Sequence, residues 1–211
     1  MNVLKRALRA YALPLQIMVR PFSGFYAMKF ENQGTLKLAF FNFFMVVLSV
    51  TFTRQYSSIL VNPRHPLAVN SIWELITLSV LLVLFCASNW AVTSLTDGEG
   101  RFKDILMATC YAMTPIIMIF IPAALFSNVL TLEEAAFYNM IISVAVAWFV
   151  FLVFAGLVTV HNYSPGKAIA TVFLTFVAIL VIAFLISLMF TLIQQLVVFV
   201  RSLYTELVFR A

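Results

Sequence analysis

The most polar stretch of this chain lies between two long apolar segments and carries the residue types best suited to chemistry. Residues 96–104 read TDGEGRFKD and hold the carboxylates of Asp97, Glu99 and Asp104. Together with the imidazole of His161, these groups could bind a divalent cation if the fold brought them together. The commoner use of such residues is a turn at the Asp-Gly pair, a helix cap at Asp104 and solvated charges. We therefore predict no metal site.

A second possibility for chemistry is a polar path through the apolar segment that follows. Pro115 and Pro122 are seven residues apart and so share one helix face, with Tyr111 and Thr114 close by. Proline removes a backbone donor and kinks a helix, and broken helices can line the substrate sites of transporters. Kinks used for packing alone are commoner. The four residues remain the polar-path candidates of a small transporter or channel.

Signatures of catalysis or cofactor binding are missing from the sequence. It contains no Walker A loop, nucleophile elbow, HExxH motif or kinase signature. Cys86 and Cys110 both lie within apolar segments, where free thiols usually act as small hydrophobic side chains. We predict a protein that is not an enzyme and that binds no cofactor.

The elements that would position these residues are long apolar helices. Hydrophobic residues make up 64% of the chain and charged residues only 10%, against about 25% in soluble domains. Unpaired backbone groups are excluded from lipid, so spanning segments are helices or closed barrels, and these segments lack the alternation of barrel strands. We predict an all-α polytopic membrane protein, a bundle of five transmembrane helices. The uncharged stretches are Leu38–Thr53, Leu75–Thr96, Ile105–Leu132, Ala135–Val160 and Ala168–Val200.

Three segments are predicted along the chain. Residues 1–34 form a cytoplasmic interfacial segment, with an amphipathic helix over Asn2–Ala12 that ends before Pro14. Residues 35–200 form the membrane domain, with spans at about 38–54, 74–95, 105–127, 136–160 and 168–193. Residues 194–211 form a helical extension at the outer face, because the last uncharged stretch exceeds a hydrocarbon core of about 30 Å and no Pro or Gly breaks it.

The distribution of basic residues predicts the orientation, since Lys and Arg in short loops stay on the cytoplasmic side. With the N-terminus inside and the C-terminus outside, Lys5, Arg6, Arg9, Arg20, Lys29, Lys37, Arg101, Lys103 and Lys167 lie inside, while Arg54, Arg64, Arg201 and Arg210 lie outside. The net charge of +5 is then directed at anionic lipids of the inner leaflet and not at nucleic acid.

The order and spacing of several short motifs resemble bacterial members of the Yip1 family over nearly the whole chain. These motifs are Pro21–Phe25 with Lys29 and Glu31, Asn89-Trp90, Asp97–Gly100, Tyr111 and Pro115, Ser127–Thr131 before Glu133-Glu134, His161–Ser164, and Glu206–Arg210. The resemblance implies five transmembrane helices and a cytoplasmic N-terminus.

The same resemblance bears on function. Eukaryotic relatives act in vesicle trafficking and bind small GTPases and other membrane proteins, but this sequence has no long polar region ahead of its first span, so GTPase binding is not expected. Some bacterial members accompany sugar ABC-importer components, which implies an accessory subunit.

Two functions are therefore weighed. The first, and favoured, is a non-enzymatic accessory or scaffold protein of the bacterial cytoplasmic membrane that engages other membrane proteins. Its partner-contact candidates are Phe22, Phe25, Asp97, Glu99 and His161. The alternative is the small transporter or channel described above. The absence of charged residues within the spans argues against proton coupling, because proton-driven machines place ionisable groups there.

Overall fold

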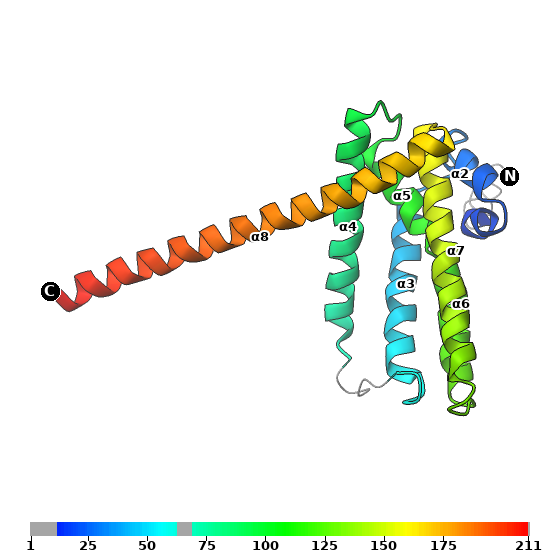
Figure 1. The fold of residues 1–211 in the computed structure, drawn as a ribbon, viewed down its shortest axis with the longest axis horizontal. Coiled ribbons are helices and arrows are strands. Elements are labelled where there is room, and N and C mark those ends of the chain that lie inside the picture. Colours follow the sequence, from blue (N-terminus) through cyan, green and yellow to red (C-terminus); the bar gives the residue numbers. More distant parts are fainter. Residues whose placement is uncertain (1–11, 63–68, 211) are drawn as a thin grey trace.

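The structure is a computed structural model that describes residues 12–62 and 69–210, and its regular elements in these ranges are all α-helices (Figure 1). Residues 12–19 are helical and lead into α2. The following helices are α2 (Pro21–Lys29), α3 (Leu36–Tyr56), α4 (Ser71–Leu95), α5 (Phe102–Ala112), α6 (Thr114–Ser127), α7 (Ala135–His161) and α8 (Pro165–Arg210). Nearly all of the predicted amphipathic helix at Asn2–Ala12 lies outside the described residues.

Within the described residues, 12–62 and 69–210, five helical segments are long and apolar enough to cross a membrane. They are α3, α4, the pair α5–α6 taken together as Phe102–Ser127, α7, and α8. The prediction of an all-α polytopic protein with five spans is confirmed. The chain is a multi-pass membrane protein.

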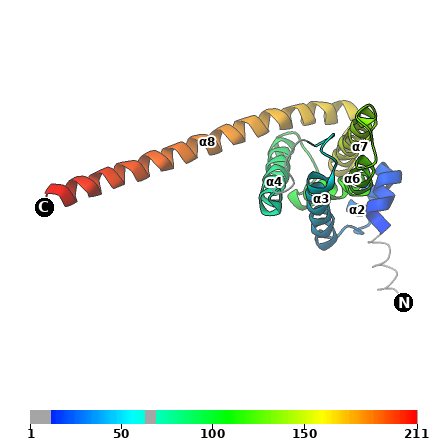
Figure 2. The ribbon, with the colours of Figure 1, turned by 90° about the horizontal axis from the view of Figure 1, so that it is seen from below.

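The helices α3, α4, α6 and α7 run side by side and form the bundle (Figures 1 and 2). Helix α3 packs on α6, α6 on α7, and α4 on α5. Helix α2, the loop of residues 96–101 and the turn between α7 and α8 meet at one end of the bundle, called here the loop end. The turns that follow α3 and α6 lie at the opposite end.

The third span is divided by a break at Met113, between α5 and α6. Pro115 has no N–H to give to the carbonyl of Tyr111, and the Thr114 hydroxyl donates to that carbonyl instead, at 2.7 Å. Asn42 on α3 donates its side-chain amide to the carbonyl of Cys110, at 2.7 Å. Because the freed backbone acceptors find partners within the bundle, non-helical backbone is tolerated at this depth. The predicted kink therefore falls just before Pro115, while Pro122 lies inside a continuous α6.

The face of α3 that packs on α6 carries further hydroxyl groups. Ser49 donates to the carbonyl of Ile116 at 3.4 Å, and Thr53 donates to that of Phe120 at 3.2 Å. Hydrogen bonds between membrane helices are worth roughly 0.6 kcal/mol each. Polar side chains on one apolar helix thus fix the register of the next.

The N-terminal helices close the bundle from the side of α7. Leu13, Ile17 and Phe25 are completely buried. The Phe25 ring lies on the backbone of Gly156, where a Cβ atom would meet the ring at 3.1 Å. Glycine allows this close approach between α2 and α7, so the buried face of α2 is part of the core.

The last helix departs from the bundle. Near its start, Ala168, Thr171 and Thr175 are buried, and α8 packs mainly on α4. Beyond this contact α8 runs out past the other helices without interruption, as Figures 1 and 2 show. Its 46 residues extend about 69 Å at 1.5 Å per residue, more than twice a hydrocarbon core of about 30 Å.

Candidate functional site

The candidate site is a group of polar residues at the loop end, called here the loop-end cluster. It consists of Lys29, Asn89, Glu99, His161 and Tyr163, together with Gly98 and Gly100 of the loop between α4 and α5. These residues come from α2, α4, α7 and the connections beside them.

The loop of residues 96–101 is folded back onto the end of α4. The N–H of Gly98 donates to the carbonyl of Thr93 at 2.8 Å, and Asp97 adopts a left-handed conformation with φ of 54°. The Asp-Gly turn is thus present, but the positive φ falls on Asp97, whose short polar side chain tolerates it. Asp104 accepts a hydrogen bond from the N–H of Arg101 at 3.2 Å, so the predicted cap of α5 is confirmed.

Gly98 and Gly100 are required by space, because both lie directly on His161. A Cβ atom on Gly98 would stand 2.6 Å from His161 Nδ1, and one on Gly100 would stand 2.6 Å from His161 Cε1 and 2.7 Å from Val160 Cγ1. Ordinary contacts between such atoms exceed 3.4 Å. The two glycines let the loop cover the imidazole and exclude water from it.

The imidazole of His161 is 1% exposed and uses both of its nitrogens. Its Nδ1 accepts from the N–H of Gly100 at 3.3 Å, and its Nε2 lies 3.3 Å from Asn89 Oδ1. Since a backbone N–H can only donate, Nδ1 is the acceptor. The proton of the neutral ring is then on Nε2, which donates a hydrogen bond to Asn89 Oδ1. These contacts assign a neutral imidazole that holds the loop onto α4.

Asn89 extends the network from α7 to α8. Its amide nitrogen donates to the Thr175 hydroxyl at 3.1 Å, and Thr175 donates in turn to the carbonyl of Thr171. Asn89, His161 and Thr175 are each at most 1% exposed. One buried amide therefore connects three spans at the loop end.

Tyr163 closes the cluster on the side of α8. Its ring stacks on His161 with centroids 5.3 Å apart, and its hydroxyl lies 2.8 Å from the Thr96 hydroxyl and donates to the Thr96 carbonyl at 3.0 Å. The Lys167 ammonium lies 4.5 Å from the centroid of the same ring. The aromatic side chain thus joins the two loops.

Lys29 joins α2 to the same place. Its ammonium donates to the carbonyl of Val160 at 2.6 Å, near the end of α7, where backbone carbonyls lack helical partners. It also lies 3.8 Å from a carboxylate oxygen of Glu99, whose side chain is 56% exposed. A cation at a helix C-terminus is favourable, so Lys29 stabilises this end of α7 and orients Glu99 at the surface.

The five partner-contact candidates are distributed between surface and interior. Phe22, Asp97 and Glu99 are exposed at the loop end. Phe25 and His161 are buried beneath this surface. Phe22 and Tyr26 on α2 and Phe30 directly after it follow at intervals of four residues, all three more than 40% exposed.

Two of the groups that the sequence offered for a divalent ion, the Asp104 carboxylate and the His161 imidazole, are used within the chain. The carboxylate of Asp104 is used at the start of α5, and the nitrogens of His161 are used by Gly100 and Asn89. Across residues 12–62 and 69–210, no three His, Cys, Asp or Glu side chains are close enough together to hold an ion.

The polar-path candidates lie at the break in the third span. Tyr111 is fully buried, and its hydroxyl donates to the carbonyl of Thr35 at 3.0 Å. The hydroxyl of Thr114 donates to the carbonyl of Tyr111 and accepts from the side-chain amide of Asn42. Pro115 is buried and Pro122 is exposed. The polar groups of these residues are thus engaged with the chain itself.

At the opposite end, a cavity of about 230 Å³ opens between α3, α6 and α7. Thr53, Arg54, Ser57, Asn62 and Tyr138 contribute its polar lining. The Arg54 guanidinium is paired with the buried Glu74 carboxylate, which links α3 to α4. The sequence did not predict this pair. Glu74 lies just before the uncharged stretch that begins at Leu75, and nothing in the sequence indicates that it meets Arg54.

Sequence reasoning also missed the central members of the loop-end cluster. Asn89 and Thr175 stand out as polar residues within apolar segments, and such residues commonly bond between helices. Nothing in the sequence, however, indicated that both lie beside His161. In the sequence, Lys29 stands out only as a basic residue and as part of the motif that follows Pro21–Phe25, and neither indicates its contact with Val160.

Comparison with known proteins supplies the family. A sequence model described as the Yip1 domain matches residues 15–197, which is most of the chain. No match is found among curated proteins or among solved structures. The matched region includes α2, the whole bundle and the loop-end cluster, and the resemblance seen in the sequence is confirmed. The chain belongs to the Yip1 family.

Proposed function

We propose that the protein is a non-enzymatic accessory or scaffold subunit of the bacterial cytoplasmic membrane, and that it engages other membrane proteins through the loop end. One observation carries the proposal: every buried polar group of the loop-end cluster is bonded within the chain, while Phe22, Asp97 and Glu99 remain exposed around it. Such an arrangement makes a rigid surface whose buried polar groups are already engaged within the chain.

The exposed part of this surface combines an aromatic stripe with carboxylates. The rings of Tyr26 on α2 and Phe30 directly after it lie 4.8 Å apart, in line with Phe22. Aromatic side chains beside a polar rim are typical of protein interfaces. Since basic residues gather at this end, the positive-inside rule supports a cytoplasmic position for the loop end, with the N-terminus inside. We take subunits of sugar ABC importers as the first partners to test.

The transporter or channel remains the alternative. The hydrogen bonds of Tyr111 and Thr114 to the chain itself argue for a packing role of the kinked third span. A flux assay in proteoliposomes separates the two functions. Uptake of a sugar, an ion or an amphiphile by proteoliposomes that contain the purified protein would favour the transporter or channel over the scaffold.

The test of the scaffold is crosslinking in native membranes followed by mass spectrometry of what co-purifies. We expect stoichiometric recovery of another membrane protein, and recovery of importer subunits would name the pathway. Neutralising the surface with Asp97→Asn and Glu99→Gln, or removing the ring with Phe22→Ala, should lower recovery at least about tenfold, as for an interface hot spot.

The matched control is Glu133→Gln, which removes an exposed carboxylate at the opposite end of the bundle. This variant should leave recovery unchanged. Purification of the protein alone, or equal losses for loop-end and control variants, would contradict the proposal.

A further inference from the structure

The last part of α8 is a long helix that no other described segment covers. From Ala183 to Phe209 every side chain is exposed. We call this stretch distal α8. Its residues are mostly apolar, but a minority are polar or charged, and their positions are informative.

The polar residues of distal α8 repeat every seven residues. Ser187, Gln194 and Arg201 form one series, Thr191 and Thr205 belong to a second that includes Val198, and Gln195 and Ser202 belong to a third that continues to Phe209. A repeat of seven keeps side chains on one stripe of a helix. The opposite face is apolar and includes Ile186, Met189, Phe190 and Ile193.

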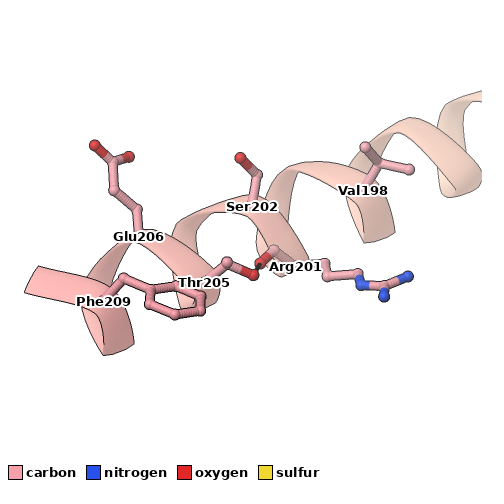
Figure 3. A pocket seen from close by; sticks show the side chains of 6 residues that line it. All are labelled: Val198, Arg201, Ser202, Thr205, Glu206 and Phe209. Atoms are coloured by element: carbon pink, nitrogen blue, oxygen red, sulfur yellow. Dashed lines mark hydrogen bonds between the residues drawn. The ribbon is translucent and has the colours of Figure 1, made fainter.

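Near the end of the helix this stripe forms an open groove, shown in Figure 3. Its lining residues are Val198, Arg201, Ser202, Thr205, Glu206 and Phe209, all from α8 itself. In heptad terms, Ser202 and Phe209 occupy the a positions, Val198 and Thr205 the d positions, Arg201 a g position and Glu206 an e position. Together these positions form one side of a seam with coiled-coil spacing. The seam is largely polar, as in membrane helix pairs that bond through Ser, Thr and Gln, and not apolar as in soluble coiled coils.

A polar stripe on an otherwise apolar helix has a physical consequence in a membrane protein. The apolar back of distal α8 suits lipid, but the amides of Gln194 and Gln195 gain nothing from it. The hydroxyls of Thr191 and Thr205 donate to carbonyls four residues earlier on the same helix, whereas Gln amides in membrane helices typically bond to a neighbouring helix. The stripe therefore indicates a helical partner on that face.

The charges identify the partner as the same helix. In a parallel coiled coil a g residue meets the e residue five positions later on the other strand, and Arg201 and Glu206 are five residues apart. A second copy related by a two-fold axis repeats the pair, so both charges on each strand are matched. Glu206 also interacts within its own chain, and a carboxylate has acceptor sites for both contacts.

The amides fit the same symmetry. Gln195 occupies an a position, where it would face its own symmetry mate, and an amide both donates and accepts. Polar residues at a positions, here Gln195 and Ser202, favour one register over others at a cost in stability. We propose that distal α8 forms a parallel two-stranded coiled coil with distal α8 of a second copy, with Arg201 of each chain paired to Glu206 of the other.

Disulfide crosslinking of the full chain in membranes tests the geometry. Val198→Cys at a d position and Val197→Cys beside it, at a c position, are matched substitutions on an exposed helix. Under mild oxidation Val198→Cys should give a covalent dimer, at a yield about tenfold above that of Val197→Cys. Thr191→Cys, one heptad earlier, should crosslink as well, because a parallel in-register pair brings every d position to its mate.

Several outcomes would overturn the proposal. Equal yields at positions 197 and 198 would mean that no seam forms. A dimer at position 198 without one at 191 would mean a crossing or antiparallel contact. Crosslinking of Val198→Cys to a different protein would mean a foreign partner. The parent chain, with its buried Cys86 and Cys110, gives the background.

Charge reversal tests the pairing of Arg201 with Glu206. In the Val198→Cys background, Arg201→Glu or Glu206→Arg alone should lower the dimer yield about fivefold, as two solvated ion pairs are lost. The double reversal should restore it. Co-expression of one tagged chain with Arg201→Glu and another with Glu206→Arg should yield mixed dimers in preference to either self-pair. Single reversals that leave the yield unchanged would contradict the proposed pairing.

Discussion

The loop-end cluster and distal α8 are built from similar apolar helices but differ in burial: the first is packed inside the chain and the second is exposed. At the loop end, α2, α4, α7 and the start of α8 bury their polar groups against one another. Distal α8 continues the same helix with every side chain exposed. The difference teaches that hydropathy decides whether a segment is a membrane helix, whereas the placement of a few polar residues decides what it packs against.

The largest expected effect comes from crowding the loop end. Gly100→Ala would place a methyl group 2.6 Å from His161, and because the imidazole is held at both nitrogens it cannot move aside. We expect a loss of about 3 kcal/mol, at the upper end for overpacking. The buried thiols of Cys86 and Cys110 provide the measurement, since they become accessible to a thiol-reactive dye on unfolding.

Gly166→Ala is the matched control for that change. Gly166 lies near the start of α8, and nothing stands within 4 Å of the Cβ position there. The control should lose no stability and could gain up to about 1 kcal/mol from helix propensity. Equal melting temperatures for the two variants would show that the loop is not held against His161.

A smaller effect is expected from removing the amide that connects three spans. Asn89→Ala leaves His161 Nε2 and the Thr175 hydroxyl with one partner fewer in a buried place. The loss should be about 1 to 3 kcal/mol. Thr191→Ala, on exposed distal α8, should change the stability of the bundle by less than about 0.5 kcal/mol. Thermal unfolding followed by dye labelling compares the two, and a larger loss for Thr191→Ala would reverse the contrast drawn above.

The smallest effect concerns the turn before α7. Hydrogen bonds from the N–H and then the hydroxyl of Thr131 hold the pKa of Glu134 below its usual value of 4.5. The ionised carboxylate therefore stabilises the turn above about pH 4.5, and this contribution is lost as the pH falls through the lowered pKa. The melting temperatures of wild type and Glu134→Gln should differ slightly at pH 7 and converge in acid. A difference that grows in acid would show the opposite sign.

Much of the fold follows from the sequence, because apolar segments without charge have few alternatives to helices in a membrane. The break before Pro115 follows from the missing donor of proline. The departure of α8 from the bundle does not follow from the sequence, since apolar side chains can pack equally well against lipid or against protein. The exposed acids of the loop end were predictable from their turn, but the burial of His161 and Phe25 was not. Their burial depends on Gly98, Gly100 and Gly156, whose lack of a side chain matters only once the helices are packed.

The chain order of the loop-end contacts has a consequence for synthesis. Lys29 is synthesised early, but its partner, the carbonyl of Val160, is synthesised 131 residues later. The partners of Asn89 follow it by 72 residues (His161) and 86 residues (Thr175). The acceptor of Asn42 in the third span, the carbonyl of Cys110, follows it by 68 residues and is therefore synthesised before His161 and Thr175. Because chains emerge from the N-terminus first, the bundle can assemble from its middle outward, while the loop end closes last. A chain interrupted before α8 would leave Asn89 without Thr175, and an unfinished copy would differ from a finished one at the surface where we expect partners to bind.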